Sequence, residues 1–235
     1  MLRCIETALK RIKKYLDQHA EPEAQRATLL SGTWRHALVI PAFNEGMSFV
    51  TSLVRLDTMR QEARNLIIVV LNATAAAPRA AHEQNTRCAQ AIRQHFRPTH
   101  SDGLLEGTSL DIFLVDRFSP DHLLPPKQGV GLARKIGGDI ATALYHSEKM
   151  QSPWFGSTDA DAHLPETYFQ RLAQNTNVSA MTFPFSHVPA PGFERAMALY
   201  ELSLHHYVLG LHWAQSPYAY HTIGSTLATH VDAYA

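Results

Sequence analysis

Short apolar runs alternate along the chain with longer stretches in which apolar residues recur at helical spacing. The apolar runs predict buried strands at residues 37–41, 66–71, 110–115, 154–158 and 178–183. The longer stretches predict helices at residues 45–59, 78–96 and 128–150, the first of them capped by Asn44. Because strands and helices alternate, we expect a single α/β domain over residues 36–235, with a mainly parallel central sheet.

The first residues follow a different pattern, which predicts an amphipathic helix ahead of this domain. Apolar side chains recur there at spacings of three and four, at Leu2, Ile5, Leu9, Ile12 and Leu16. Proline, glycine and acidic residues then predict a linker near residues 18–35. We therefore assign residues 1–35 to an N-terminal helix and linker, and expect that residues 1–20 can be removed without unfolding the domain. A weak contact of residues 1–17 with a membrane surface or a protein is an alternative role for the helix.

The composition of the 235-residue chain narrows the class of protein. Apolar residues make up 45% and charged residues 18%, which is typical of a globular chain and not of a disordered one. The 21 basic residues equal the 21 acidic residues, so the basic excess of a nucleic-acid-binding protein is missing. No apolar run approaches the roughly 20 residues of a membrane helix. The two cysteines, Cys4 and Cys88, are too few for a disulfide framework and favour a reducing, cytoplasmic location.

Polar residues follow the predicted strands, at the positions where parallel sheets bind ligands. Asn44 and Glu45 come directly after the strand at 37–41, where the start of a helix favours anions and polar side chains can bind hydroxyl groups. Asn72 follows the strand at 66–71. Each of these residues, taken alone, is better explained as a helix cap, a first-turn acid or a turn residue.

Asp159 and Asp161 form the sharpest local signal, because they follow the strand at 154–158 and stand two residues apart. In an extended segment, residues two apart point to the same side. Two carboxylates on one side repel each other unless a cation lies between them, and Mg²⁺ or Mn²⁺ there would also bind a diphosphate. The sequence therefore predicts a metal site. The alternative is a solvated turn in which one aspartate caps a helix.

A glycine-rich segment at residues 127–137 carries two basic residues, Arg134 and Lys135. Glycines let a backbone approach a ligand closely, and basic side chains there can bind phosphate. The spacing of the glycines differs from that of a dinucleotide-binding loop. The alternative is the start of a helix whose small residues pack on the sheet.

Together, these segments resemble the family 2 glycosyltransferases, which have the GT-A fold. Residues 39–45 resemble the opening strand of that family, and residues 131–137 resemble its glycine and Ala-Arg stretch. Residues 159–161 resemble its Asp-x-Asp motif, and residues 220–229 resemble its acceptor-side glycine segment. The resemblance implies a GT-A-like, Rossmann-like domain that transfers a sugar from a nucleotide-diphosphate sugar to an acceptor hydroxyl. It also implies a divalent metal, Mn²⁺ or Mg²⁺, and inversion at the sugar.

The resemblance further implies roles for individual residues. The implied nucleotide-sugar ligands are Pro41, Phe43, Glu45, Asn72, Arg134 and Asp159. Asp161, together with Asp159, would bind the metal. His221, Gly224 and Ser225 would lie on the acceptor side.

Two features depart from the family. Asn72 stands where the family often has an acidic residue, so we expect base recognition to differ. The catalytic base of the family lies in a Glu-Asp type motif beyond the glycine segment, and the sequence ends at Ala235 before any such motif. We therefore expect a truncated chain, a different base, or no catalysis. Two alternatives stay open, a nucleotide-sugar domain that binds without turnover and a nucleotidyltransferase.

Overall fold

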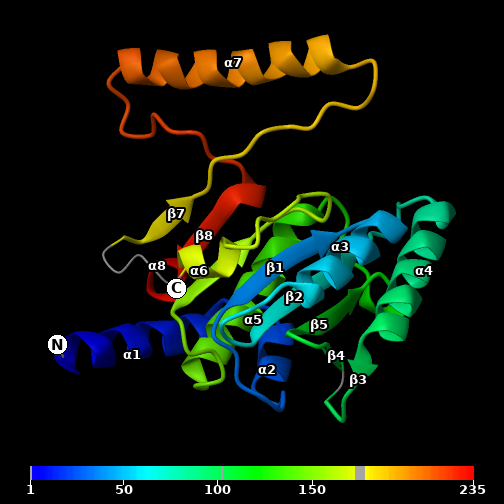
Figure 1. Cartoon of the computed structure of the whole chain (residues 1–235). Helices are drawn as coiled ribbons and strands as arrows, with labels where there is room; N and C mark the ends of the chain where they lie inside the picture. Colours follow the sequence, from blue (N-terminus) through cyan, green and yellow to red (C-terminus); the bar gives the residue numbers. More distant parts are fainter. Residues whose placement is uncertain (1, 102, 173–177) are drawn as a thin grey trace.

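The structure, a computed structural model that describes residues 2–101, 103–172 and 178–235, is built on a mixed sheet of eight strands (Figure 1). In sheet order these are β3 (Arg97–Pro98), β4 (Leu104–Glu106), β5 (Leu110–Arg117), β2 (Asn65–Asn72), β1 (Ala37–Ala42), β6 (Trp154–Ser157), β8 (Leu227–His230) and β7 (Ala180–Thr182). The predicted α/β class is confirmed, and the five predicted strands correspond to β1, β2, β5, β6 and β7.

Only the four central strands, β5, β2, β1 and β6, run parallel to one another. The outer strands β3 and β4 on one side, and β8 and β7 on the other, pair antiparallel. The prediction of a mainly parallel sheet therefore holds for the core and is wrong for the edges. At the β4 edge the reason is the length of the connection. Residues 107–109 are the whole link between β4 and β5, and so short a link allows only antiparallel pairing. The parallel strands are joined through helices.

Helices cover both faces of the sheet (Figure 1). One layer consists of α3 (Met47–Thr58), α4 (Arg79–His95) and α6 (Tyr168–Leu172). The other consists of α1 (Leu2–Gln18), α2 (Glu23–Ala27), α5 (Val130–His146) and α8 (Val231–Tyr234). Successive side chains of β1 divide between the layers, because Leu38 and Ile40 pack in the first and Val39 packs in the second. A strand covered on both faces needs apolar residues at every position, which explains the continuous apolar run.

The direction of the chain across the sheet reverses between β1 and β6. The chain passes from β1 to β2 and β5 in one direction, and then returns through α5 to the other side of β1. β6 pairs with β1 only over Ala37–Val39, whereas β2 pairs with β1 up to Ala42. The carboxyl end of β1 is therefore not paired with β6, at the position where open α/β sheets bind ligands.

The segment predicted as a linker belongs instead to the packed domain. It contains α2, whose Ala24 and Ala27 are buried, and it continues through the buried side chains of Leu30 and Trp34. The predicted cap of the next helix is also wrong. The residue before α3 is Gly46, because Asn44 has a left-handed backbone with a φ of 60° and cannot serve as the extended residue that precedes a helix.

One buried carboxylate, that of Asp139 on α5, joins both ends of the described chain to the helical layer. It accepts hydrogen bonds from the hydroxyl groups of Tyr15 (2.8 Å) and Tyr234 (2.9 Å). It also accepts bonds from the backbone N–H of Glu21 and from Lys135 Nζ, both at 2.8 Å. Burial, reinforced by the charge of Asp139, raises the pKa of Tyr234, so that this hydroxyl remains a donor. These bonds dock α1 and α8 on α5.

The helix α7 (Glu194–Trp213), which the apolar pattern does not predict, stands away from the sheet (Figure 1). None of its 20 residues is buried, and apolar residues occur all around it. Such a helix has no polar face, so it lacks the periodic signal that identifies an amphipathic helix. Among the described residues, no helix is both long and apolar enough to cross a membrane.

The docking of α1 can be tested at two positions of its predicted apolar stripe. Ile12 is buried, whereas Leu9 is 38% exposed. We expect Ile12→Ala to lower the free energy of unfolding by about 2 kcal/mol or more, because it opens a cavity between α1 and α5. Leu9→Ala should change that free energy by less than about 0.5 kcal/mol. Urea denaturation of both variants measures the difference, and equal small losses would show that α1 is not docked.

The close approach of α5 to β1 can be tested at two glycines of the glycine-rich segment. A Cβ atom on Gly137 would lie 2.2 Å from Val39 Cγ1, whereas one on Gly131 would meet nothing within 4 Å. We expect Gly137→Ala to cost about 1–3 kcal/mol of stability through overpacking. Gly131→Ala should be neutral or stabilise α5 by up to about 1 kcal/mol. Thermal unfolding of the two variants checks this, and indistinguishable melting temperatures would contradict the packing.

Candidate functional site

The loop after β1, residues 43–46, is held in place by two side chains of α4. Asn85 Oδ1 accepts a hydrogen bond from the Asn44 N–H (2.9 Å), and Gln84 Nε2 donates to the Glu45 carbonyl (2.9 Å). Asn85 Nδ2 also donates to the Asn72 carbonyl at the end of β2 (3.0 Å). The loop is therefore fixed at the carboxyl edge of the sheet, with the side chain of Glu45 half-buried.

Sequence reasoning missed Gln84 and Asn85, although one signal was present. Asn85 occupies an apolar position of α4, four residues after Ala81 and three before Cys88, and all three residues are buried. A buried amide needs hydrogen-bond partners, so its place in an apolar stripe indicates a fixed polar contact. The identity of that contact, the loop after β1, depends on how α4 crosses the sheet.

The end of β6 brings Asp159 and Asp161 to the same edge. The Thr158 N–H donates to the Val39 carbonyl (3.0 Å), and the next residues form a turn in which the Ala162 N–H donates to the Asp159 carbonyl (3.2 Å). The expected extended geometry of the two aspartates is therefore wrong. Ala160 is buried between them and anchors the turn in the core, while both carboxylates remain accessible.

Arg134 on α5 is the basic residue that meets these carboxylates. Its guanidinium group forms an ion pair with Asp159. Gly224, in the 3₁₀ turn η2 (Gly224–Thr226), lies against the same group, because a Cβ atom there would be 2.7 Å from Arg134 Nη1. Three predicted positions from three separate segments thus meet at one point, and a side chain at position 224 would collide with the guanidinium group.

Glu45 lies within the electrostatic field of both aspartates. Burial raises the pKa of the Glu45 carboxyl, and the negative charges of Asp161 and Asp159 raise it further. The carboxyl group therefore takes up a proton more readily than an exposed glutamate. A bound cation would relieve the same repulsion.

The N-terminus of α5 places a positive partial charge near Arg134. The helix begins at Val130 and runs back along the sheet from its carboxyl edge, so its unpaired N–H groups lie at that edge. Cβ atoms on Gly129 and Gly131 would meet nothing within 4 Å, which leaves the backbone there open to a ligand. The buried polar atoms that lack a hydrogen-bond partner in the described part of the chain include Arg134 Nε, Ser157 Oγ and Thr158 Oγ1, which retain bonding capacity.

Other predicted positions have different surroundings. Asn72 is buried, and its side-chain amide donates to the carbonyls of Ala42 (3.0 Å) and Val70 (3.2 Å), so it braces β1 against β2. Pro41 is buried inside β1, whereas Phe43 is 44% exposed next to Glu45. Of these three positions, Phe43 therefore offers the most surface to a ligand.

The predicted acceptor residues His221 and Ser225 flank Gly224. His221 Nε2 lies 3.1 Å from His205 Nδ1 on α7, and Ser225 is half-buried in η2. This segment therefore connects α7 with the position of Arg134.

The described carboxylates at the predicted metal site are not arranged around one metal position. Within the ranges that the structure describes, no three carboxylate, histidine or cysteine side chains converge on one metal position. Asp159 is turned toward Arg134. Neither Asp161 nor Glu45 forms an ion pair with any described residue, so both carboxylates are available.

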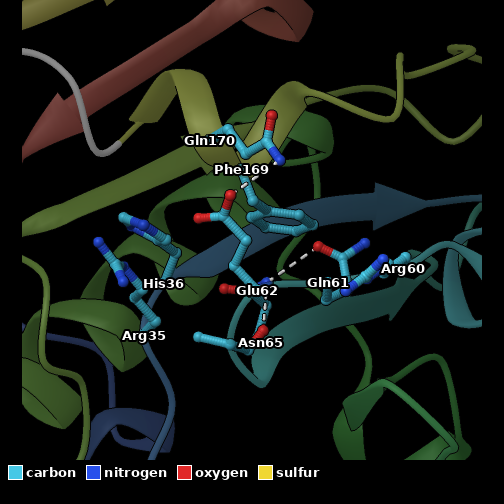
Figure 2. A pocket seen from close by; sticks show the side chains of 9 residues that line it. Arg35, His36, Arg60, Gln61, Glu62, Asn65, Phe169 and Gln170 are labelled. Carbon is cyan, nitrogen blue, oxygen red and sulfur yellow. Dashed lines mark hydrogen bonds between the residues drawn. The ribbon is translucent and has the colours of Figure 1, made fainter.

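A small, open groove lies at the opposite, amino edge of the sheet (Figure 2). Figure 2 shows that its side chains bond to one another, with Gln170 donating to Glu62 (3.2 Å) and Asn65 donating to Gln61 (3.3 Å). Burial, reinforced by the charge of Arg35, lowers the pKa of the lining residue His36 to about 4, so His36 is neutral at pH 7. None of the predicted site residues lines this groove. The candidate site is therefore the carboxyl edge.

Comparisons with known proteins leave the family open. The chain matches no protein-family model, and no curated protein matches it. The glycosyltransferase interpretation accordingly depends on the motifs and on the geometry of the carboxyl edge.

The environment of Glu45 predicts a pH dependence of stability. Because its pKa is raised from 4.5 in the folded state, the unfolded chain loses this proton first, and stability falls as the pH rises from about 4.5 through the raised value. We expect Glu45→Gln to be more stable than the wild type at pH 7 and nearly equal to it at pH 4. Urea denaturation at the two pH values measures this. A Glu45→Gln variant that is less stable at pH 7 would show that the charge of Glu45 is stabilising.

Proposed function

We propose that this chain is a GT-A-type glycosyltransferase domain that uses a nucleotide-diphosphate sugar as donor and an acceptor hydroxyl as its second substrate. The observation that carries the proposal is the meeting of Arg134, Asp159 and Gly224 at the carboxyl edge, with Glu45 close enough for the charge of Asp159 to raise its pKa. These residues come from four separate segments, and each belongs to a stretch that resembles the family. An Asp-x-Asp turn that occurs by chance would not be expected to lie near the other segments that resemble the family.

The diphosphate of the donor suits the positive groups of the site. Arg134 offers a guanidinium group with unused hydrogen-bonding capacity at Nε, and the first turn of α5 adds N–H groups that favour anions. As the bond to the sugar breaks, negative charge develops on the leaving nucleoside diphosphate. Fixed positive groups next to that charge lower the barrier, which is often the largest contribution to such a reaction.

A divalent cation fits the carboxylates at this edge. Carboxylate oxygens are the preferred ligands of Mn²⁺ and Mg²⁺, and the repulsion that raises the pKa of Glu45 is the kind that a cation removes. Asp161 and Asp159 would hold the ion, with Glu45 beside them. When bound, the ion supplies positive charge to the diphosphate.

The acceptor would approach from the side of His221, Gly224 and Ser225, and no residue is assigned as catalytic base. The alternative function, binding without turnover, predicts the same nucleotide affinity with no transfer. Loss of a general base typically lowers the rate by a factor of about 10² to 10⁴, so slow transfer with normal binding would indicate a missing base. Binding and turnover therefore need separate measurements.

The proposed binding site predicts metal-dependent nucleotide binding. We expect UDP or GDP to bind more tightly in the presence of Mn²⁺, and Asp161→Asn to remove most of that dependence. Arg134→Gln should weaken nucleotide binding about tenfold or more with and without metal, because a charged hydrogen bond to phosphate is lost. Isothermal titration calorimetry of the wild type and both variants measures these affinities.

Asp17→Asn serves as the matched control, because it removes an exposed carboxylate on α1 whose ion-pair partner among the described residues is Lys13. This control should bind as the wild type does. Equal affinity of the wild type with and without Mn²⁺ would refute the metal site. Release of pyrophosphate from nucleoside triphosphates, without hydrolysis of nucleotide-sugars, would favour the nucleotidyltransferase alternative.

A further inference from the structure

The helix α7 presents an apolar stripe that no described part of the chain covers. The stripe is formed by residues spaced alternately three and four apart, namely Leu199, Leu202, His206, Leu209 and Trp213. The three leucines are 58–65% exposed, and Trp213 is 92% exposed. Because folded monomers rarely leave a contiguous apolar surface of this kind in water, the stripe requires a partner.

The opposite side of α7 is already occupied by the two segments that lead to and from the helix. Its half-buried positions are Met197, Glu201, Leu204, Val208 and Leu211. The His187 N–H donates to Glu201 Oε1 (2.7 Å), and His205 contacts His221 on the returning segment. These contacts attach the helix to both segments, and the helix stands away from the sheet (Figure 1).

We propose that this stripe packs against the same stripe of a second copy of the chain, as an antiparallel pair of α7 helices. Leu199, His206 and Trp213 are spaced seven residues apart. A two-fold axis at His206 therefore places Leu199 opposite Trp213 of the second copy, and brings Leu202 within one residue of the level of Leu209. Such a self-complementary surface is what a two-fold dimer requires. Antiparallel packing also sets the helix dipoles in opposition.

The area of the stripe agrees with that of a dimer interface. A helix of 20 residues is about 30 Å long. A whole aromatic side chain buries about 150–250 Å², and Trp213 is almost fully exposed beside the three exposed leucines of the stripe. The helix thus offers apolar surface on the order of the 800 Å² that each partner contributes to a stable complex. Because the chain carries no net charge, two copies do not repel each other at long range.

A membrane surface is a poorer match for this helix than a second copy. Helices that lie on membranes usually carry several Lys or Arg residues on their polar side, which attract anionic lipids. The helix α7 contains Arg195 and no lysine, and its inner side is occupied by the segments described above.

The test is the mass of the full chain in solution, with variants in the stripe. We expect sedimentation velocity and light scattering to give a dimer, twice 26.2 kDa. Leu202→Asp and Leu209→Asp should each shift the chain to monomer, because each places a charge in the interface. Ser203→Asp is the matched control, since it adds the same charge to α7 beside the stripe, and it should remain dimeric. Circular dichroism confirms that each variant is folded.

A second measurement tests the antiparallel arrangement and does not depend on variants that break the dimer. In a Cys4→Ser background, His206→Cys should form an intermolecular disulfide under mild oxidation, because the two copies of this residue meet at the axis. Glu194→Cys should not, because the N-terminal ends of the paired helices lie apart. Cys88 is buried and does not interfere.

Several outcomes would overturn the proposal. These are a monomer at all concentrations, a dimer that persists in Leu209→Asp, or a cross-link at Glu194→Cys instead of His206→Cys. A monomer that sediments with lipid vesicles through α7 would assign the stripe to a membrane surface instead.

Discussion

The buried carboxylate of Asp139 is the interaction on which the arrangement of the helices depends. A charge without solvent is stable only when donors surround it, and here the donors come from α1, from the segment before α2, from α5 itself and from α8. Segments far apart in the sequence must therefore assemble together around α5. Because Arg134 lies five residues earlier on the same helix, the constraint that positions α5 also positions the guanidinium group of the candidate site.

Small residues complete this positioning. A side chain at Gly137 would collide with Val39 of β1, and one at Gly138 would come within 2.7 Å of the Tyr234 hydroxyl. The glycines of this segment thus serve two purposes, since Gly137 and Gly138 allow close packing, whereas Gly129 and Gly131 leave the start of the helix open. Of the two explanations that the sequence suggested for the segment, close packing on the sheet is confirmed at Gly137, and ligand binding stays a prediction for its open start.

The chain segments on either side of α7 link this helix to the candidate site. The segments that carry α7 continue directly into β7 on one side and into η2 and β8 on the other. Gly224 of η2 lies against Arg134, and His221 contacts α7 through His205. If two copies pair through α7, the acceptor side of each site is attached to the dimer interface, so association would restrict the position of the segment that an acceptor must approach.

The apolar pattern by itself determined the α/β class, the core strands and the helices between them, because burial on both faces of a sheet leaves a continuous apolar run and burial on one face of a helix leaves a period. It also indicated Glu45 and Asp159, because they follow strands, whereas Arg134 was indicated by its place in a glycine-rich segment. Tertiary structure decided the rest. The antiparallel edges, the role of Asn72 as a brace, the turn at Asp159 and the burial of α2 and Trp34 in the core depend on contacts between segments distant in sequence. Local patterns cannot encode such contacts, because the free energy of a hydrogen bond or ion pair depends on which partner the fold brings near.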